Sequence, residues 1–234
     1  AYHNEEGVGN AISKCGVPRD ELFITTKVWI SNAGYDKAKA SIDESLRKLK
    51  SDYIDLLLIH QPFGDYYGTY RAMEEAYKAG KVRAIGVSNF YPDRFVDLAE
   101  FCEITPAVNQ VETHVFNQQI KLQEVMKEYG TKIMSWGPFA EGRNDFFTNA
   151  TLQEIGKEYG KSVAQVALRY LIQRDIIVIP KSTHKERMIE NFNVFDFALT
   201  PDDMAAIAEL DTAQTLFFSH YDPEMVKWLI NYSK

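Results

Sequence analysis

Short apolar runs alternate with longer amphipathic segments along almost the whole chain. The runs predicted to form strands are residues 22–28, 54–60, 82–88, 107–112, 132–137 and 176–180. Their centres lie about 24 to 44 residues apart, which is the spacing of repeated strand–helix units. Strands that alternate with helices form parallel sheets, because each helix returns the chain to the same edge. The chain is therefore predicted to have an α/β fold.

The segments themselves carry the expected patterns. Residues 54–60 are apolar almost throughout, as in a strand that is covered on both faces. Residues 36–49 place Ile42, Leu46 and Leu49 on one stripe, which predicts a helix with one buried face. Residues 118–129 repeat that pattern, and residues 4–15 are predicted to form a helix before the first strand. Signals for helix ends and starts are Gly80, Gly130, Gly160, the capping-box pair Ser162 and Gln165, and Thr200 followed by Pro201.

An open doubly wound sheet and a closed eight-stranded barrel both fit this alternation. The open dinucleotide-binding fold carries three spaced glycines directly after a strand, whereas Gly7 and Gly9 lack the third glycine and any preceding strand. This difference favours the barrel, although only six strands are counted. No Pro- or Ser-rich linker divides the 234 residues, so residues 1–234 are predicted to form a single domain.

Composition excludes several classes of function. The 26 basic and 33 acidic residues give a net charge of −7, which is unsuited to a broad nucleic-acid footprint. No stretch approaches the roughly 20 apolar residues of a membrane span. The cysteines Cys15 and Cys102 do not make a disulfide scaffold, so a reducing, cytoplasmic setting is predicted. No metal site is predicted.

Polar and aromatic side chains occur where the predicted strands end. In a barrel, these ends line one mouth, where the chemistry takes place. Alone, Lys27 is readily explained as a surface lysine, His60 as a structural histidine and Trp136 as core. A packed core does not require so many polar strand ends, so together they predict a site. The residues at these ends are Lys27, His60, Ser88, Asn89, Gln110, Trp136 and Lys181.

Ordered motifs across the chain resemble those of the aldo-keto reductase family. They are AYHNE, TTKVW, LLIHQP, GVSNF, PAVNQVE, SWGPFAEGR and VIPKSTHKERMIEN. The resemblance is nearest to bacterial 2,5-diketo-D-gluconate reductases and prostaglandin F synthase-like members. It implies a (β/α)8 TIM barrel that binds NADPH and reduces an aldehyde or ketone to an alcohol. By this resemblance, the sequence lacks the first two strands and the first helix of that barrel, together with an aspartate that pairs with the lysine.

The resemblance assigns catalytic roles to Tyr2 as the proton donor, Lys27 as its neighbour and His60 as the group that orients the carbonyl. Hydride transfer to a carbonyl carbon leaves negative charge on the oxygen, which needs a proton donor. A free phenol has a pKa near 10, and a nearby ammonium is expected to lower that value. By its position alone, Tyr2 would instead be a frayed terminal residue.

The resemblance also assigns the cofactor contacts. Ser88, Asn89 and Gln110 match the residues that bind the nicotinamide carboxamide, and Trp136 stands where an aromatic ring stacks on the nicotinamide. Residues matching the site for the 2′-phosphate and adenosine are Lys181, Ser182, Thr183, Arg187, Glu190 and Asn191. A cluster of cations in an acidic protein favours NADP(H) over NAD, because only NADP(H) has the extra phosphate. The alternative is a solvated helix start with ordinary surface charges.

Substrate contacts are predicted for Trp29, as an aromatic pocket wall, and for His114; simple loop packing is the alternative for both. Residues 211–234 resemble the C-terminal loop that closes over substrate, although an aromatic tail packed on the barrel explains them equally well. Phe139 and the following loop lie where they could flank the cofactor. The predicted protein is a monomer that acts on a small-molecule carbonyl compound and binds neither nucleic acid nor membrane. The alternatives are an NADPH-binding partner protein and an inactive fragment.

Overall fold

The computed structural model describes residues 1–232, which fall into two compact units. The first unit contains Ala1–Asn109, Tyr129–Thr131 and the C-terminal stretch from His220. The second unit contains Gln110–Glu128 and Lys132–Ser219. No helix within the described residues is long and apolar enough to span a membrane.

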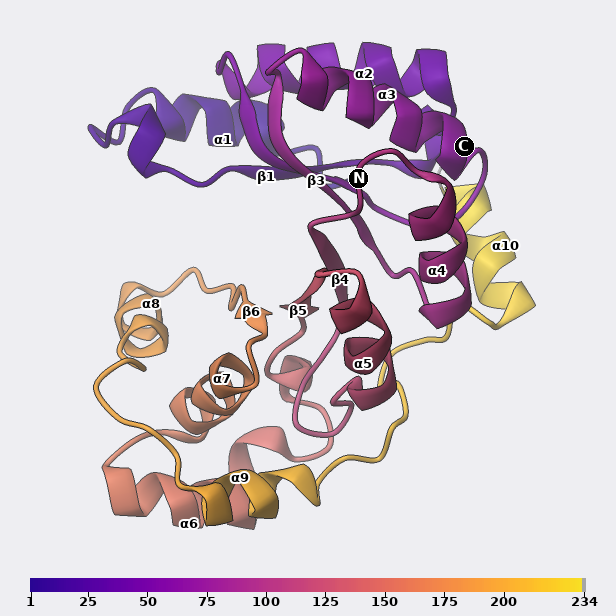
Figure 1. Ribbon diagram of the computed structural model, residues 1–234. Helices are drawn as coiled ribbons and strands as arrows, with labels where there is room; N and C mark the ends of the chain where they lie inside the picture. Colours follow the sequence, from indigo (N-terminus) through magenta and orange to yellow (C-terminus); the bar gives the residue numbers. More distant parts are fainter. Residues whose placement is uncertain (233–234) are drawn as a thin grey trace. The chain divides into compact units, whose positions relative to one another are not determined.

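A parallel sheet forms the centre of the first unit. Strands β1 (Thr25–Val28), β2 (Ile54–Ile59) and β3 (Val82–Ser88) pair in the order of the chain. Every residue of β2 is buried, as the continuous apolar run predicts. The helices of this unit are α1 (Glu5–Ile12), α2 (Tyr35–Leu49), α3 (Tyr66–Lys78), α4 (Pro92–Phe101) and α10 (Pro223–Tyr232). Helices α2 and α3 lie side by side (Figure 1).

Helix α2 shows how the apolar stripe is used, because Ile42 and Leu49 are buried while the charged residues between them face outward. Helix α1 packs on α2 through Gly9. A Cβ atom at Gly9 would lie 2.2 Å from the carbonyl oxygen of Lys48, so no side chain fits there. Gly9 therefore allows close packing of two helices, and a phosphate-binding loop is not needed to explain it.

The second unit continues the alternation of strands and helices. Strand β4 (Val108–Glu112) begins in the first unit and carries the chain into the second. Strands β5 (Lys132–Trp136) and β6 (Ile177–Val178) pair in parallel, with Met134 opposite Ile177. The helices are α5 (Ile120–Glu128), α6 (Ala150–Tyr159), α7 (Val163–Gln173), α8 (Lys185–Phe192) and α9 (Pro201–Ala208). Short 3₁₀ turns occur at η3 (Ala140–Gly142) and η4 (Phe146–Thr148).

The described residues form the six predicted strands, but the first and the last are shorter than expected. Ahead of β1, the Ile24 N–H donates to the Asp55 carboxylate, and Arg19 donates to the Leu22 carbonyl. These side chains thus form hydrogen bonds with backbone groups that would pair with a neighbouring strand if β1 were longer. In the second unit, the Ile176 N–H donates to the Leu171 carbonyl near the end of α7. Only residues 177–178 are then left for strand pairing.

Helix α9 has the capping box expected at its start. The Thr200 Oγ1 accepts a hydrogen bond from the Asp203 N–H at 3.1 Å, and the Asp203 carboxylate accepts one from the Thr200 N–H at 2.8 Å. Because Thr200→Ala removes one of these caps, we expect it to lower the free energy of unfolding by about 1 kcal/mol. Urea unfolding measures this change. Thr200→Ser keeps the hydroxyl and should remain close to the original protein; equal losses in both variants would contradict the capping role.

Candidate active site

The three residues predicted to be catalytic lie together in the first unit. Lys27 is in β1, His60 directly follows β2, and Tyr2 precedes α1. The Tyr2 hydroxyl lies 3.3 Å from His60 Nε2, within hydrogen-bond distance. The Lys27 Nζ lies 5.4 Å from the centre of the Tyr2 ring. The ends of two adjacent strands thus place an ammonium and an imidazole beside one phenol.

Burial controls the protonation of this cluster. His60 is 8% exposed, and burial, with a contribution from the Lys27 ammonium, lowers the pKa of His60 to about 3. His60 is therefore neutral at physiological pH. Burial also lowers the pKa of Lys27. The expectation that Lys27 would lower the pKa of Tyr2 is wrong for this structure, because partial burial raises the pKa of Tyr2 above its ordinary value even though the residue is 67% exposed. The phenol consequently keeps its proton at neutral pH.

The low pKa of His60 makes stability depend on pH. An unfolded histidine has a pKa near 6.5, so between about pH 3 and 6.5 the unfolded chain binds a proton that folded His60 does not. This contribution to stability is fully present above pH 6.5 and is lost as the pH falls through that window. We expect His60→Asn to reduce the proton uptake on unfolding at pH 5 by about one proton. Urea unfolding at several pH values measures the slope; an unchanged slope in the variant would contradict this.

The polar residues at the end of β3 form a buried network in the same unit. The Asn89 side-chain amide donates to the His60 carbonyl at 3.2 Å and to Ser88 Oγ at 3.2 Å. Asn89 has a positive φ of 63°, an unusual backbone conformation that asparagine tolerates better than most residues. The rings of Trp29 and His60 pack in an edge-to-face arrangement, with 4.8 Å between ring centres. Trp29, predicted to be a pocket wall, therefore lies beside the imidazole.

In the second unit, Gln110 and Trp136 lie on β4 and at the end of β5. The Gln110 side-chain amide lies 3.2 Å from the Met134 sulfur. The Trp136 ring contacts Phe217, at 5.1 Å between ring centres. His114 is 0% exposed; its Nδ1 accepts the Phe116 N–H, and its Nε2 lies 2.9 Å from the Glu112 carboxylate. This burial favours the packing alternative for His114.

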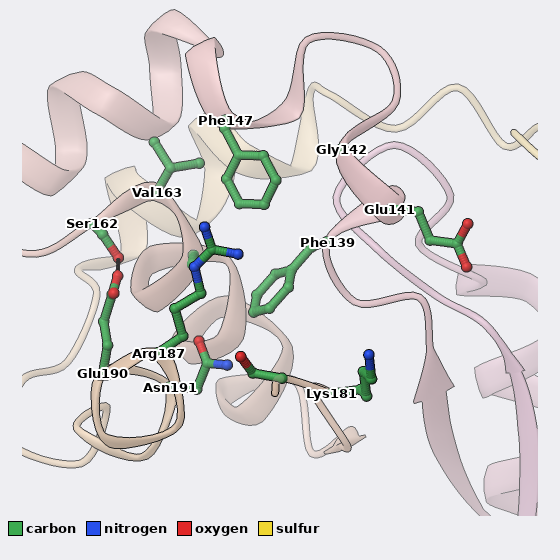
Figure 2. Close-up of a pocket in the computed structure, with 12 residues that line it drawn as sticks. Phe139, Glu141, Gly142, Phe147, Ser162, Val163, Lys181, Arg187, Glu190 and Asn191 are labelled. Atoms are coloured by element: carbon green, nitrogen blue, oxygen red, sulfur yellow. Dashed lines mark hydrogen bonds between the residues drawn. The ribbon is translucent and has the colours of Figure 1, made fainter. Parts of the chain in front are cut away.

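A cavity of about 470 Å³ lies within the second unit (Figure 2). Predicted cofactor residues line it, namely Lys181, Ser182, Arg187, Glu190 and Asn191, but not Thr183. Two cations and a hydroxyl suit a phosphate group, and the rings of Phe139 and Phe147 offer apolar surface to a base. These residues fit a nucleotide that carries a phosphate on its ribose.

Other lining residues were not predicted to contact a nucleotide. They are Phe147, Ser162, Val163 and Ala164, together with Phe139, Glu141 and Gly142, which were expected only to flank the cofactor. Ser162 was predicted as a helix cap, and it is one: its Oγ accepts the Gln165 N–H at 3.2 Å and also donates to the Glu190 carboxylate (Figure 2). The cap of α7 thereby holds a pocket residue of α8. The capping pattern in the sequence identified Ser162 as a helix cap, but it did not indicate that α8 lies against the start of α7.

Comparison with known proteins agrees with this geometry. The model of the Aldo/keto reductase family matches residues 1–212. The chain belongs to the aldo-keto reductase family. The predicted family is therefore confirmed, and family members are oxidoreductases that act on small carbonyl compounds.

Individual relatives support this assignment. A 9,11-endoperoxide prostaglandin H2 reductase of Trypanosoma cruzi is 47% identical over 212 residues, which are 90% of this chain and 75% of that relative. A glyoxal reductase of Bacillus subtilis is 46% identical, over 90% of this chain and 76% of that relative. The structure of a Bombyx mori aldo-keto reductase in complex with NADP has a TM-score of 0.87 and 36% identity, covering 100% of this chain and 82% of that one. The predicted (β/α)8 barrel fold class is confirmed by these matches.

Proposed function

We propose that this protein reduces an aldehyde or ketone to an alcohol, with NADPH as the hydride donor and Tyr2 as the proton donor. The observation that carries the proposal is the 3.3 Å separation of the Tyr2 hydroxyl from Nε2 of a neutral, buried His60, with Lys27 adjacent. A protonated phenol beside a neutral imidazole is suited to receiving a carbonyl oxygen as it becomes negative.

When bound, NADPH supplies a hydride to the carbonyl carbon. The Tyr2 O–H donates its proton to the carbonyl oxygen, and the Lys27 ammonium stabilises the phenolate that remains. In the tautomer with its proton on Nε2, His60 donates a hydrogen bond to the same oxygen and limits its approach. The raised pKa of Tyr2 keeps the donor protonated before each turnover, and so makes the stabilisation by Lys27 more necessary.

The cofactor contacts are proposed in the same way. Lys181, Ser182 and Arg187 bind the 2′-phosphate, and the cavity that they line supports this assignment. Thr183 is also proposed to contact this phosphate, but only its position in the motif supports that contact. Adenine is proposed to contact Glu190 and Asn191 on the same cavity wall. Ser88, Asn89 and Gln110 are proposed to bind the carboxamide of the nicotinamide. Trp136 is proposed to stack on the face of the nicotinamide ring. The 2′-phosphate contacts make NADPH the preferred cofactor over NADH.

Small carbonyl compounds are the proposed substrates, and Trp29 is proposed as one wall of their pocket because it packs on His60. Glyoxal is a suitable first probe because a 46% identical relative is a glyoxal reductase. The test is loss of NADPH absorbance with glyoxal and with a simple ketone. Turnover supports the proposal. Tight NADPH binding without turnover on any carbonyl would contradict it and indicate an NADPH-binding partner protein.

A further inference from the structure

Glu112 is a buried carboxylate at the end of β4 that the proposed reaction does not use. It is 6% exposed and accepts three hydrogen bonds. His114 Nε2 and the Leu216 N–H each reach its Oε1 at 2.9 Å, and the Thr215 hydroxyl donates to Oε2. A buried carboxylate requires such partners, because an unpaired one is strongly destabilising. Two of the three donors belong to the segment after α9.

The protonation of this cluster is consistent with an ionised carboxylate. Burial alone would raise the pKa of Glu112, but hydrogen bonds from His114, Thr215 and Leu216 hold it below its usual value. Because His114 Nδ1 accepts the Phe116 N–H, Nε2 is the ring nitrogen that donates to Glu112. The fully buried histidine and the Leu216 N–H therefore bind the same carboxylate oxygen, Oε1.

The tail segment held by Glu112, residues 215–218, places two aromatic rings on Trp136. The ring centres of Phe217 and Phe218 lie 5.1 Å and 6.5 Å from that of Trp136, in an edge and a stacked arrangement. Arg143 holds the same segment separately: its guanidinium donates to the Leu216 carbonyl at 2.5 Å and lies 4.3 Å from the centre of the Phe217 ring. The orientation of Trp136 consequently depends on a segment that is fixed at its backbone.

We propose that Glu112 is a positioning residue: it fixes residues 215–218, and through Phe217 and Phe218 it fixes the Trp136 ring on which the nicotinamide stacks. The inference rests on the proposed function in assigning the nicotinamide to Trp136. The proposal predicts different effects at the nicotinamide end and at the adenosine end of the cofactor. Loss of the Glu112 contacts should weaken binding at the nicotinamide end and leave the adenosine cavity unchanged, because His114, Thr215 and Leu216, which bind the Glu112 carboxylate, do not line that cavity.

The test compares Glu112→Leu, Glu112→Gln, Thr215→Val and the exposed control Glu158→Gln. Leucine is similar in size but accepts no hydrogen bond, whereas glutamine keeps an oxygen for His114 and Leu216. Two measurements are made on each folded variant. Hydrogen–deuterium exchange measures how fast the amide hydrogens of Leu216 and Phe217 exchange with solvent. Titration gives Kd for NADPH and for adenosine 2′,5′-bisphosphate, which contains only the adenosine end.

For Glu112→Leu, we expect tail exchange and the Kd for NADPH to rise about tenfold, while the Kd for the bisphosphate stays within about twofold. Glu112→Gln should keep tail exchange and the Kd for NADPH close to those of the original protein. If Glu112→Leu does not fold, Thr215→Val should show a smaller increase in both quantities. Unchanged tail exchange, an unchanged NADPH Kd, or equal weakening of both ligands would overturn the inference. Absence of turnover with normal NADPH binding would overturn only the proposed function.

Discussion

Replacing Tyr2 with phenylalanine should lower kcat for carbonyl reduction by about 10²–10⁴-fold, the usual contribution of a positioned general acid. The substitution removes only the hydroxyl oxygen that lies 3.3 Å from His60, and the ring beside Lys27 remains. Because this hydroxyl is proposed to contact the substrate rather than the cofactor, the Kd for NADPH should change by less than about twofold. Steady-state kinetics and a fluorescence titration provide the two measurements.

Tyr77→Phe is the matched control for this variant. Tyr77 is an exposed tyrosine on α3 in the same unit, and removal of its hydroxyl should leave kcat unchanged. A Tyr2→Phe protein with kcat within about threefold of the original would mean that another group donates the proton. Equal loss in both variants would point to instability of the first unit rather than to lost acid catalysis.

The second large effect is expected at the cation pair of the cavity. Lys181→Met and Arg187→Met should each raise the Kd for NADPH by about 10–100-fold, because each removes a charge-assisted contact to a phosphate. Both side chains line the cavity of the second unit. NADH lacks the 2′-phosphate, so its Kd should change by less than about threefold. The preference for NADPH over NADH should therefore collapse in either variant.

An exposed lysine of the same unit is the control for this pair. Lys157→Met, on α6, removes the same charge outside the cavity and should leave both cofactor affinities nearly unchanged. Parallel weakening of NADPH and NADH in Lys181→Met or Arg187→Met would show that these residues support the shape of the cavity without recognising the phosphate.

The strands and the catalytic cluster were predictable because each depends on local patterns. Apolar runs of the right length predicted every strand, and the buried β2 follows directly from residues 54–60. A motif at each of three positions indicated Tyr2, Lys27 and His60, which the structure brings together. Their protonation was not predictable in the same way. The direction of the Tyr2 pKa shift depends on how many atoms surround the phenol, which a motif does not specify.

The parts of the site that escaped prediction depend on contacts between segments distant in sequence. Ser162 was identifiable as a cap, but its bond to Glu190 requires that α8 lie against the start of α7. His114 was a reasonable substrate residue from its position after β4, yet the Glu112 carboxylate and the Phe116 N–H occupy both ring nitrogens. The tail was ambiguous for the same reason, because its hydrogen bonds to Glu112 span more than 100 residues of sequence.

The most direct test of the central claim follows the hydride itself. The protein is incubated with glyoxal and NADPH in which both hydrogens at C4 of the nicotinamide are deuterium, and the alcohol product is analysed by mass spectrometry. The account predicts one deuterium on the former carbonyl carbon of each product molecule, formed in step with NADPH oxidation. Product formed without deuterium, or oxidation of NADPH without alcohol, would contradict it.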